Sequence, residues 1–202
     1  MATQQSLRRY WHSLRCFWIS SLEAELEYQM NLVVELLSVL GNLAGSVLVL
    51  KLLAGPQQQI GGWSWNGALL VLGIYTLLDG ITSCLLQPNL SKIVNHVQNG
   101  TLDFVLLKPI DSQFWLSTRT ISPWGLPGIL AGLALMGWAA LHSGHAVNAA
   151  SLSLTAALLL ASVLILYSLW FLLASLSIWF VKIWNATEVL RYVLVAGRYP
   201  IS

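Results

Sequence analysis

Long apolar runs alternate with short amphipathic stretches along this chain, and the apolar runs set its predicted architecture. A transmembrane helix takes about 20 mostly apolar residues, and four runs have suitable lengths, at residues 32–54, 67–87, 124–142 and 152–181. The last run carries no formal charge and is too short for two spans and a turn, so it predicts one long, tilted span. The pattern therefore predicts an all-α, polytopic membrane fold with four transmembrane helices.

Both ends of the chain have amphipathic patterns. In residues 5–29, aromatic and apolar residues recur at helical spacing opposite a basic set: Arg8, Arg9, His12 and Arg15. A basic helix rich in Trp lies along an anionic membrane surface, and a helix packed on the rest of the protein is the alternative. Residues 185–195 predict another amphipathic helix. Three glutamates at alternate positions share no helical face and are expected to be solvated: Glu23, Glu25 and Glu27.

Residues 88–123 separate the second and third spans and contain several helix-start and helix-stop signals. Gln87-Pro88 is expected to end the second span, because proline disfavours helical geometry at the residue before it. An amphipathic helix is expected to follow over residues 89–98. Further on, Asp111 caps a short helix that Ser122-Pro123 breaks. The sequence therefore predicts short interfacial helices over this whole segment rather than an irregular loop.

A short apolar cassette lies inside this segment, between the Asn99-Gly100 turn and the Lys108-Pro109 stop signal. We expect Thr101 to cap a short helix there, with Asp103 near its positive end. The apolar residues of the cassette are Leu102, Phe104, Val105, Leu106 and Leu107. The cassette is too short to cross a bilayer and too apolar for a solvated loop, so it should press against a partner or the membrane surface.

Composition agrees with a membrane protein. Hydrophobic residues make up 56% of the chain and charged residues only 9%, whereas soluble domains carry about 25% charged residues. A net charge of +2, spread along the chain, gives no reason to expect a nucleic-acid partner. Cys16 and Cys84 are isolated in the sequence, which argues against a disulfide framework or a Cys-x-x-Cys metal site.

The basic residues predict the orientation in the membrane. Nine of the ten Lys and Arg residues fall in the N-terminal helix, the central segment and the tail: Arg8, Arg9, Arg15, Lys92, Lys108, Arg119, Lys182, Arg191 and Arg198. The two intervening loops contain none. By the positive-inside rule both termini and residues 88–123 are cytoplasmic, which makes the apolar cassette a cytoplasmic knob suited to mechanical coupling.

Candidate chemistry in the spans is sparse. Asp79 lies within the second span, where a carboxylate costs about 2.5–3.5 kcal/mol on the insertion scale. Two interpretations stay open: Asp79 belongs to a substrate path or proton relay, or it is a packing residue that hydrogen-bonds within the helix bundle. Two GxxxG patterns permit close helix packing: Gly41 with Gly45, and Gly128 with Gly132. His142 and His145 have metal-ligand spacing but no acidic or thiol neighbour, so a metal site is not expected. The sequence has no phosphate-binding loop or nucleophile motif, so we predict no enzyme activity and no directly bound cofactor.

The central run NGTLDFVLLKPIDSQF, preceded by LLQPNLSKIVNHV and followed by SPWGLP, resembles permease subunits of bacterial type-2 ABC transporters. The tail NATEVLRYVLVAGRYPIS is similar to the same subfamily, whose substrate is uncharacterised. The resemblance implies an exporter permease in the inner membrane and a second permease copy or related permease. It also implies a dimeric ATP-binding subunit that holds ATP and Mg. The residues it implies for coupling to that subunit are Gly100, Thr101, Leu102, Asp103, Leu106, Leu107, Lys108 and Pro109.

The resemblance also implies six spans, with two following the AGRYP segment, whereas Ser202 ends the sequence soon after it. A truncated or divergent sequence explains this, and so does a second polypeptide that supplies the missing helices. Two alternative functions stay open: a secondary transporter or channel that uses Asp79, and a membrane assembly or anchoring protein that transports nothing.

Overall fold

The computed structural model of the chain describes residues 2–26, 29–54, 59–60, 62–144, 148–179, 192–195 and 197. Its elements in chain order are α1 (Ala2–Leu26), α2 (Gln29–Ala54), β1 (Gln59–Ile60), β2 (Trp63–Ser64), α3 (Trp65–Ile81), the π-helix η1 (Thr82–Leu86), α4 (Gln87–Gln98), α5 (Leu102–Leu106), α6 (Ser112–Thr118), the 3₁₀-helix η2 (Pro123–Gly125), α7 (Leu126–His142) and α8 (Ala149–Leu176). Apart from one short antiparallel strand pair, β1 with β2, the regular elements of the described residues are helices, as predicted.

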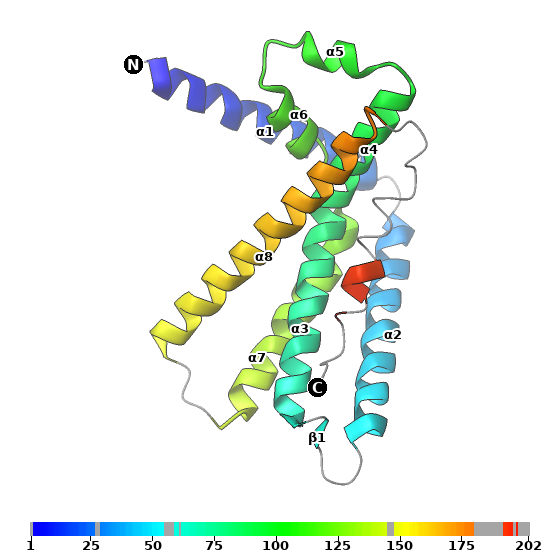
Figure 1. The fold of residues 1–202 in the computed structure, drawn as a ribbon, viewed down its shortest axis with the longest axis vertical. Coiled ribbons are helices and arrows are strands. Elements are labelled where there is room, and N and C mark those ends of the chain that lie inside the picture. Colours follow the sequence, from blue (N-terminus) through cyan, green and yellow to red (C-terminus); the bar gives the residue numbers. More distant parts are fainter. Residues whose placement is uncertain are drawn as a thin grey trace.

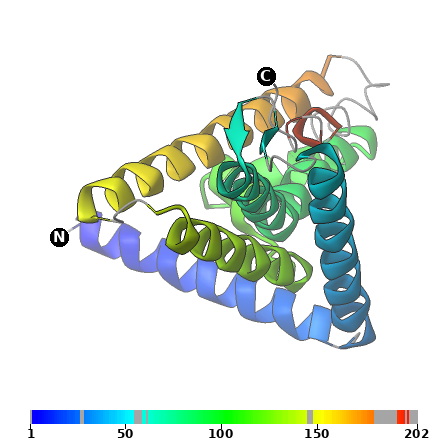
Figure 2. The ribbon, with the colours of Figure 1, turned by 90° about the horizontal axis from the view of Figure 1, so that it is seen from below.

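α3 and α7 lie side by side at the centre of the molecule (Figure 1), and α1, α2 and α8 outline a triangle around them in projection (Figure 2). α1, α5 and α6 gather at one end, together with the last turns of α4 and α8. The β1–β2 hairpin lies at the opposite end. This arrangement groups α1 and the central segment, two of the three stretches that the positive-inside rule predicts to be cytoplasmic, at one end of the molecule, whereas residues 192–195 of the third are drawn part-way down it.

Within the described part of the chain, four helices are long and apolar enough to cross a membrane: Val33–Ala54, Trp65–Gln98, Pro123–His142 and Ala149–Leu176. The number of spans agrees with the sequence prediction, and so does the single long helix at the fourth position. Asn148 begins that last helix through a capping box with Ser151. Of the amphipathic helix predicted at 185–195, residues 192–195 are helical and the others lie outside the described residues.

The second span differs most from its prediction, because Pro88 does not end it. α3, η1 and α4 form one continuous helix from Trp65 to Gln98. Proline has no N–H, so the carbonyl four residues earlier, that of Cys84, has no donor from within the helix. The Ser122 N–H donates to that oxygen instead, at 2.9 Å. The π-turn ends at Gln87, whose N–H donates to the Thr82 carbonyl. Together these bonds let the helix pass through proline.

Glycines bring the backbones of α3 and α7 into contact. A Cβ on Gly80 would lie 2.5 Å from the Ile129 nitrogen, and a Cβ on Gly132 would lie 2.5 Å from the Leu77 nitrogen. Both distances are to backbone atoms, which cannot move aside as a flexible side chain does. The Gly128–Gly132 pattern is therefore used for this contact, as small residues are in membrane helix pairs. Gly41 and Gly45 of α2 face open space among the described residues.

Two apolar clusters hold the outer helices to the central pair. Leu50 of α2 packs with the first turns of α3 and with Ala139 of α7. At the other end, η1 and α4 pack against the second half of α8, where Trp170 is fully buried. The first half of α8 is mostly exposed and diverges from α3 and α7 in Figure 1. α8 is therefore anchored at the α4 end of the molecule.

We expect Gly132→Ala to lower the thermal stability of the detergent-solubilised protein. The added methyl group overpacks the α3–α7 contact, at a cost of about 1–3 kcal/mol. Gly137→Ala is the matched control, because a Cβ there meets nothing within 4 Å and the same exchange gains about 0.5–1 kcal/mol of helix propensity. Thermal unfolding followed by circular dichroism measures both variants. Equal melting temperatures would contradict the close contact.

Candidate functional site

The turn that precedes the apolar cassette follows from the end of α4. Gly100 adopts φ +65°, a conformation that glycine takes without steric cost. The Thr101 N–H bonds the His96 carbonyl at 2.9 Å. Thr101 occupies the N-cap position of α5, but the prediction that its side chain caps the helix is wrong. Its backbone is not extended as an N-cap requires, and its hydroxyl lies 2.8 Å from Nδ1 of His96 instead.

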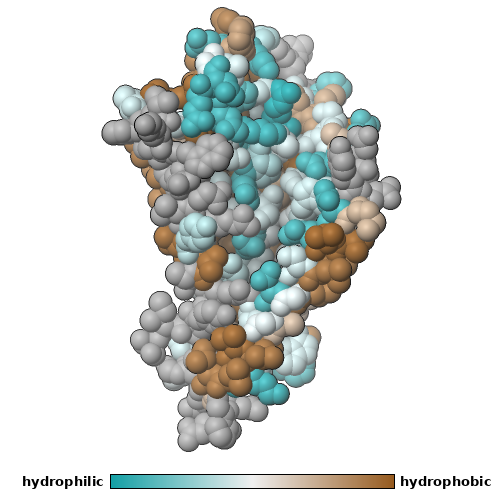
Figure 3. Space-filling view, turned by 90° about the vertical axis from the view of Figure 1, so that its right-hand side faces the viewer, coloured by the Kyte–Doolittle hydropathy of each residue, from teal (hydrophilic) through white to brown (hydrophobic). Residues whose placement is uncertain are grey.

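α5 presents an apolar ridge to the outside, formed by Phe104, Leu106 and Leu107. Their side chains are 69%, 57% and 80% exposed, while Val105 points inward and is 3% exposed. In Figure 3 hydrophilic residues gather at this end of the molecule, with a small hydrophobic cap at the apex, where Figure 1 places α5. An exposed apolar group rimmed by polar residues is typical of an interaction surface.

The eight residues implied for coupling include Leu106 and Leu107 of this ridge, and the other six precede or follow the ridge in the sequence. Five of them are exposed: Gly100, Asp103, Leu106, Leu107 and Pro109. Three are partly buried: Thr101, Leu102 and Lys108. Phe104 was not among the implied residues, although its exposure and its place in the apolar cassette put it on the same surface.

Trp115 lies behind the ridge and joins three parts of the segment. Its side chain is 6% exposed, and α6, which carries it, is capped by Asp111 as predicted, through a 2.8 Å bond from the Phe114 N–H. The amine of Lys108 lies 3.8 Å from its ring centroid and the guanidinium carbon of Arg119 lies 4.5 Å away. Such cation–π contacts stabilise a buried ring by about 0.5–2 kcal/mol each. Partial burial and the neighbouring Arg119 lower the pKa of the Lys108 amine.

Hydrogen bonds hold the end of this segment to the long helix. The buried Asn89 amide donates to the Thr120 carbonyl at 2.6 Å and accepts from the Thr120 N–H at 2.8 Å. It also donates to the Leu85 carbonyl at 2.7 Å. With the bond between Ser122 and Cys84, these contacts fix residues 120–122 to the helix that contains Pro88. The peptide before the third span is therefore held to the second.

α1 is hydrogen-bonded to residues 118–124, which include the same peptide. The Trp18 indole donates to the Thr118 carbonyl at 3.1 Å, and Ser21 donates to the Ile121 carbonyl at 2.9 Å. The Trp124 indole donates to Glu25 at 2.6 Å. The prediction that Glu25 is solvated is therefore wrong. The amphipathic face of α1 packs on the protein, which was the alternative to a helix that contacts only the membrane surface.

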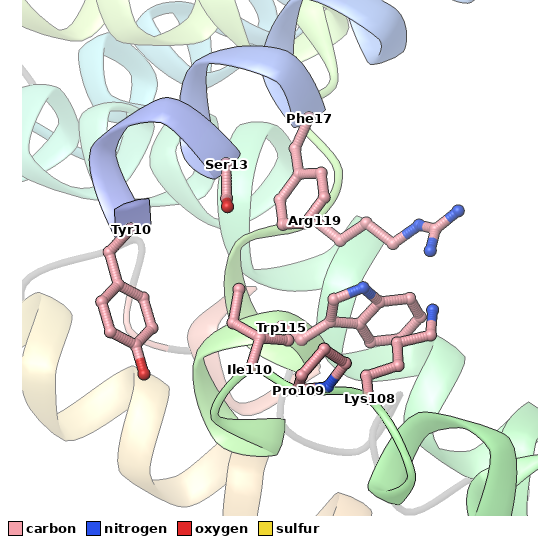
Figure 4. A pocket seen from close by; sticks show the side chains of 8 residues that line it. All are labelled: Tyr10, Ser13, Phe17, Lys108, Pro109, Ile110, Trp115 and Arg119. Carbon is pink, nitrogen blue, oxygen red and sulfur yellow. The ribbon is translucent and has the colours of Figure 1, made fainter. Parts of the chain in front are cut away.

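A half-open pocket of about 490 Å³ lies between α1 and the central segment (Figure 4). Its lining residues are Tyr10, Ser13, Phe17, Lys108, Pro109, Ile110, Trp115 and Arg119. A second cavity of about 360 Å³ shares Lys108, Trp115 and Arg119 with it and reaches Lys92 and His96 on α4. The sequence analysis did not name Trp115 and used Arg119 only as one of the basic residues that predict the orientation. The i, i+4 spacing of Trp115 on α6 and Arg119 at its C-cap was the signal that could have paired them.

The other candidate residues lie away from this site. Asp79 is partly buried on α3, beside the Gly80 contact with α7, and is separated from Gln98 by roughly 28 Å along the helix. His142 stacks on Trp138 with ring centroids 4.5 Å apart, and His145 lies outside the described residues. Among the described residues no group of three or more His, Cys, Asp or Glu side chains is placed to hold a metal ion.

The fold and the site define a multi-pass helical membrane protein with a structured amphipathic segment between its second and third spans. The family model described as ABC-2 family transporter protein matches residues 40–202, and the chain belongs to this family. It is accordingly a membrane transport permease, which confirms the family resemblance of the central run and the tail. Neither the curated proteins nor the solved structures gave a match to the chain.

We expect Asn89→Ala to loosen the peptide before the third span. The change leaves the N–H and C=O of the partly buried Thr120 without their partner, at up to about 1–3 kcal/mol for each unsatisfied group. Hydrogen–deuterium exchange should increase at residues 119–122. The control is Asn95→Ala, at an exposed position of the same helix, and it should leave exchange there unchanged. If both variants exchange alike, Asn89 does not hold this peptide.

Proposed function

We propose that this permease is a subunit of an ATP-driven exporter and that residues 88–123 couple it to a separate ATP-binding subunit. The observation that carries the proposal is the apolar ridge of Phe104, Leu106 and Leu107, exposed at the end of the molecule predicted to be cytoplasmic. The absence of a phosphate-binding motif supports a partner that supplies ATP hydrolysis. The export direction rests on the resemblance of the central run to exporter permeases.

The contacts around the ridge support mechanical coupling. Val105 anchors α5 in the cavity that Trp115 also lines, and Trp115 belongs to α6. Residues 120–122 then connect α6 to the second and third spans through Asn89 and Cys84. Stretching these hydrogen bonds would leave backbone N–H or C=O groups unpaired in an apolar setting, which is energetically costly. A displacement of the ridge therefore moves the ends of two spans together.

In the proposed cycle the ATP-binding subunit acts as a dimer that holds ATP and Mg, and this chain pairs with a second permease copy or a related permease. Closure of the dimer displaces residues 88–123 and favours one of two arrangements of the spans. The N-terminus and α1 lie on the cytoplasmic side of a bacterial inner membrane in this arrangement, as the distribution of basic residues supports.

Replacing two ridge residues tests the coupling role. We expect the double variant Phe104→Asp with Leu107→Asp to weaken binding to the ATP-binding subunit about tenfold or more. Burying one such side chain is worth about 1.5–3 kcal/mol, and a tenfold change is about 1.4 kcal/mol. Both residues are more exposed than Leu102, so their replacement spares the interior of the segment. The affinity is measured between purified permease and candidate ATP-binding subunits.

The matched control is Asn95→Asp, which adds a negative charge at an exposed neighbouring position and removes no apolar surface. It should bind the subunit as the unmodified chain does. An undiminished affinity of the double variant for a subunit that binds the unmodified permease would refute the coupling role of the ridge. Binding without any ATP-dependent flux in the reconstituted complex would instead favour an assembly or anchoring protein.

The position of Asp79 in an apolar helix supports the second candidate, a secondary transporter or channel. The two proposals predict different results for the variant Asp79→Asn. For the ATP-driven permease, Asp79→Asn should preserve stimulation of ATP hydrolysis by the reconstituted permease. For the secondary transporter, the same change should abolish ion-dependent flux that needs no nucleotide. Measurements of ATP hydrolysis and ion flux in the same proteoliposomes separate them.

A further inference from the structure

The pocket between α1 and the central segment has its cations at one end, hydroxyl groups from Ser13 and Tyr10 on the α1 side, and apolar side chains over the rest of its lining. In Figure 4 the Lys108 amine and the Arg119 guanidinium point the same way past the Trp115 ring, while Tyr10 lies on the far side. The apolar part of the lining comes from Phe17 of α1 and from Pro109 and Ile110 of the segment. A ligand that fills it should therefore have an anionic end and an apolar end.

Among the described residues that line this pocket and the adjoining cavity, none has a carboxylate. Within the described residues neither Lys108 nor Arg119 forms an ion pair, and their contacts are with the Trp115 ring. The adjoining cavity brings Lys92 to the same cluster, where its amine donates to the Thr120 hydroxyl at 3.0 Å. Mutual repulsion contributes to the lowered pKa of Lys108. An anion placed between these side chains would relieve that repulsion.

The cluster lies at the depth of lipid headgroups. Lys92 is 27 residues beyond Trp65 on one continuous helix, which corresponds to roughly 40 Å. A bilayer with its headgroup regions is about 40–45 Å thick, and Trp65 is at the interface end of the span, as tryptophans of the aromatic belt are. Trp11 of α1 is 70% exposed, as expected for a helix in contact with the interface. Lipid from the adjoining leaflet can therefore reach the pocket.

We propose that this pocket binds the phosphate-bearing headgroup of an anionic phospholipid from the leaflet that adjoins α1. Arg119 and Lys108 contact the phosphate, because a guanidinium donates two parallel hydrogen bonds to such oxygens and an ammonium adds a point charge. Phe17, Ile110 and Pro109 contact the first methylene groups of an acyl chain. A volume of about 490 Å³ accommodates a headgroup and the start of a chain rather than a whole lipid.

The site selects against zwitterionic lipids, because a choline or ethanolamine group would bring a further positive charge to the cations of the pocket. Binding joins α1 to the loop that carries Lys108 and so stabilises the base of α5. The inference stands without the ATP-binding subunit, since every contact it uses lies within this chain. It adds a dependence on membrane composition to a transport permease.

The test is lipid retention by the full chain, purified from vesicles of phosphatidylcholine mixed with phosphatidylglycerol and measured by native mass spectrometry. We expect the unmodified chain to retain phosphatidylglycerol in preference to phosphatidylcholine. The double variant Lys108→Gln with Arg119→Gln should reduce this preference about tenfold or more, since it removes the charge-assisted hydrogen bonds. Arg119→Lys keeps the charge and should keep most of the preference, which separates loss of binding from loss of folding.

Arg15→Gln is the matched control, because Arg15 is exposed on α1 and does not line the pocket. It should leave the preference unchanged. An equal loss in Arg15→Gln would overturn the site in favour of general surface charge. Inorganic phosphate that displaces phosphatidylglycerol at low concentration would show a free-anion site instead. Displacement of the lipid by an acidic segment of the ATP-binding subunit would show a protein-docking site.

Discussion

The hydrogen bond between the Ser122 N–H and the Cys84 carbonyl determines how the two central spans are joined. Pro88 removes the donor that this carbonyl would have inside a helix, and an unpaired carbonyl in an apolar setting is costly. The bond to Ser122 satisfies it and brings the start of the third span to the middle of the second helix. Asn89 then holds Thr120 from the next position along the helix. A proline that would otherwise weaken the helix becomes the point where another segment is attached.

α1 is also hydrogen-bonded to this region, so α1, the second span and the start of the third span are held together at residues 118–124. Trp18, Ser21 and Glu25 recur on one face of α1 and contact residues 118–124. Before this region in the chain, the Trp115 ring contacts two cations, Lys108 and Arg119. α5 contributes one buried side chain, Val105. α5 packs mainly against α4 and α6, whereas α6 also packs against η1 and the peptide after it is tightly hydrogen-bonded. A partner that contacts the ridge therefore displaces residues 118–124 through Trp115 and α6.

The sequence predicts the parts of this architecture that depend on local chemistry. Bilayer thickness sets the length of each span, so the four apolar runs give four helices, and Asp111 caps α6 because its own backbone permits it. Two of the predictions that fail, those for Glu25 and Pro88, involve residues far apart in the chain. Glu25 has its partner 99 residues away in Trp124, and Pro88 remains in a helix because Ser122 supplies a donor. Thr101 fails as a cap because the end of α4, and not its own side chain, sets its backbone angles.

Exposed apolar side chains have different meanings at different depths in this molecule. Leu160 and Leu164 of α8 are exposed, but lipid tails are as apolar as leucine, so their exposure needs no protein partner. Phe104 and Leu107 follow the end of a 34-residue helix, which is longer than the roughly 30 Å hydrocarbon core by some 20 Å. They lie where water or a protein must be the neighbour, and leaving such a group in water is unfavourable. The same degree of exposure is therefore ordinary in α8 and indicates a binding surface in α5.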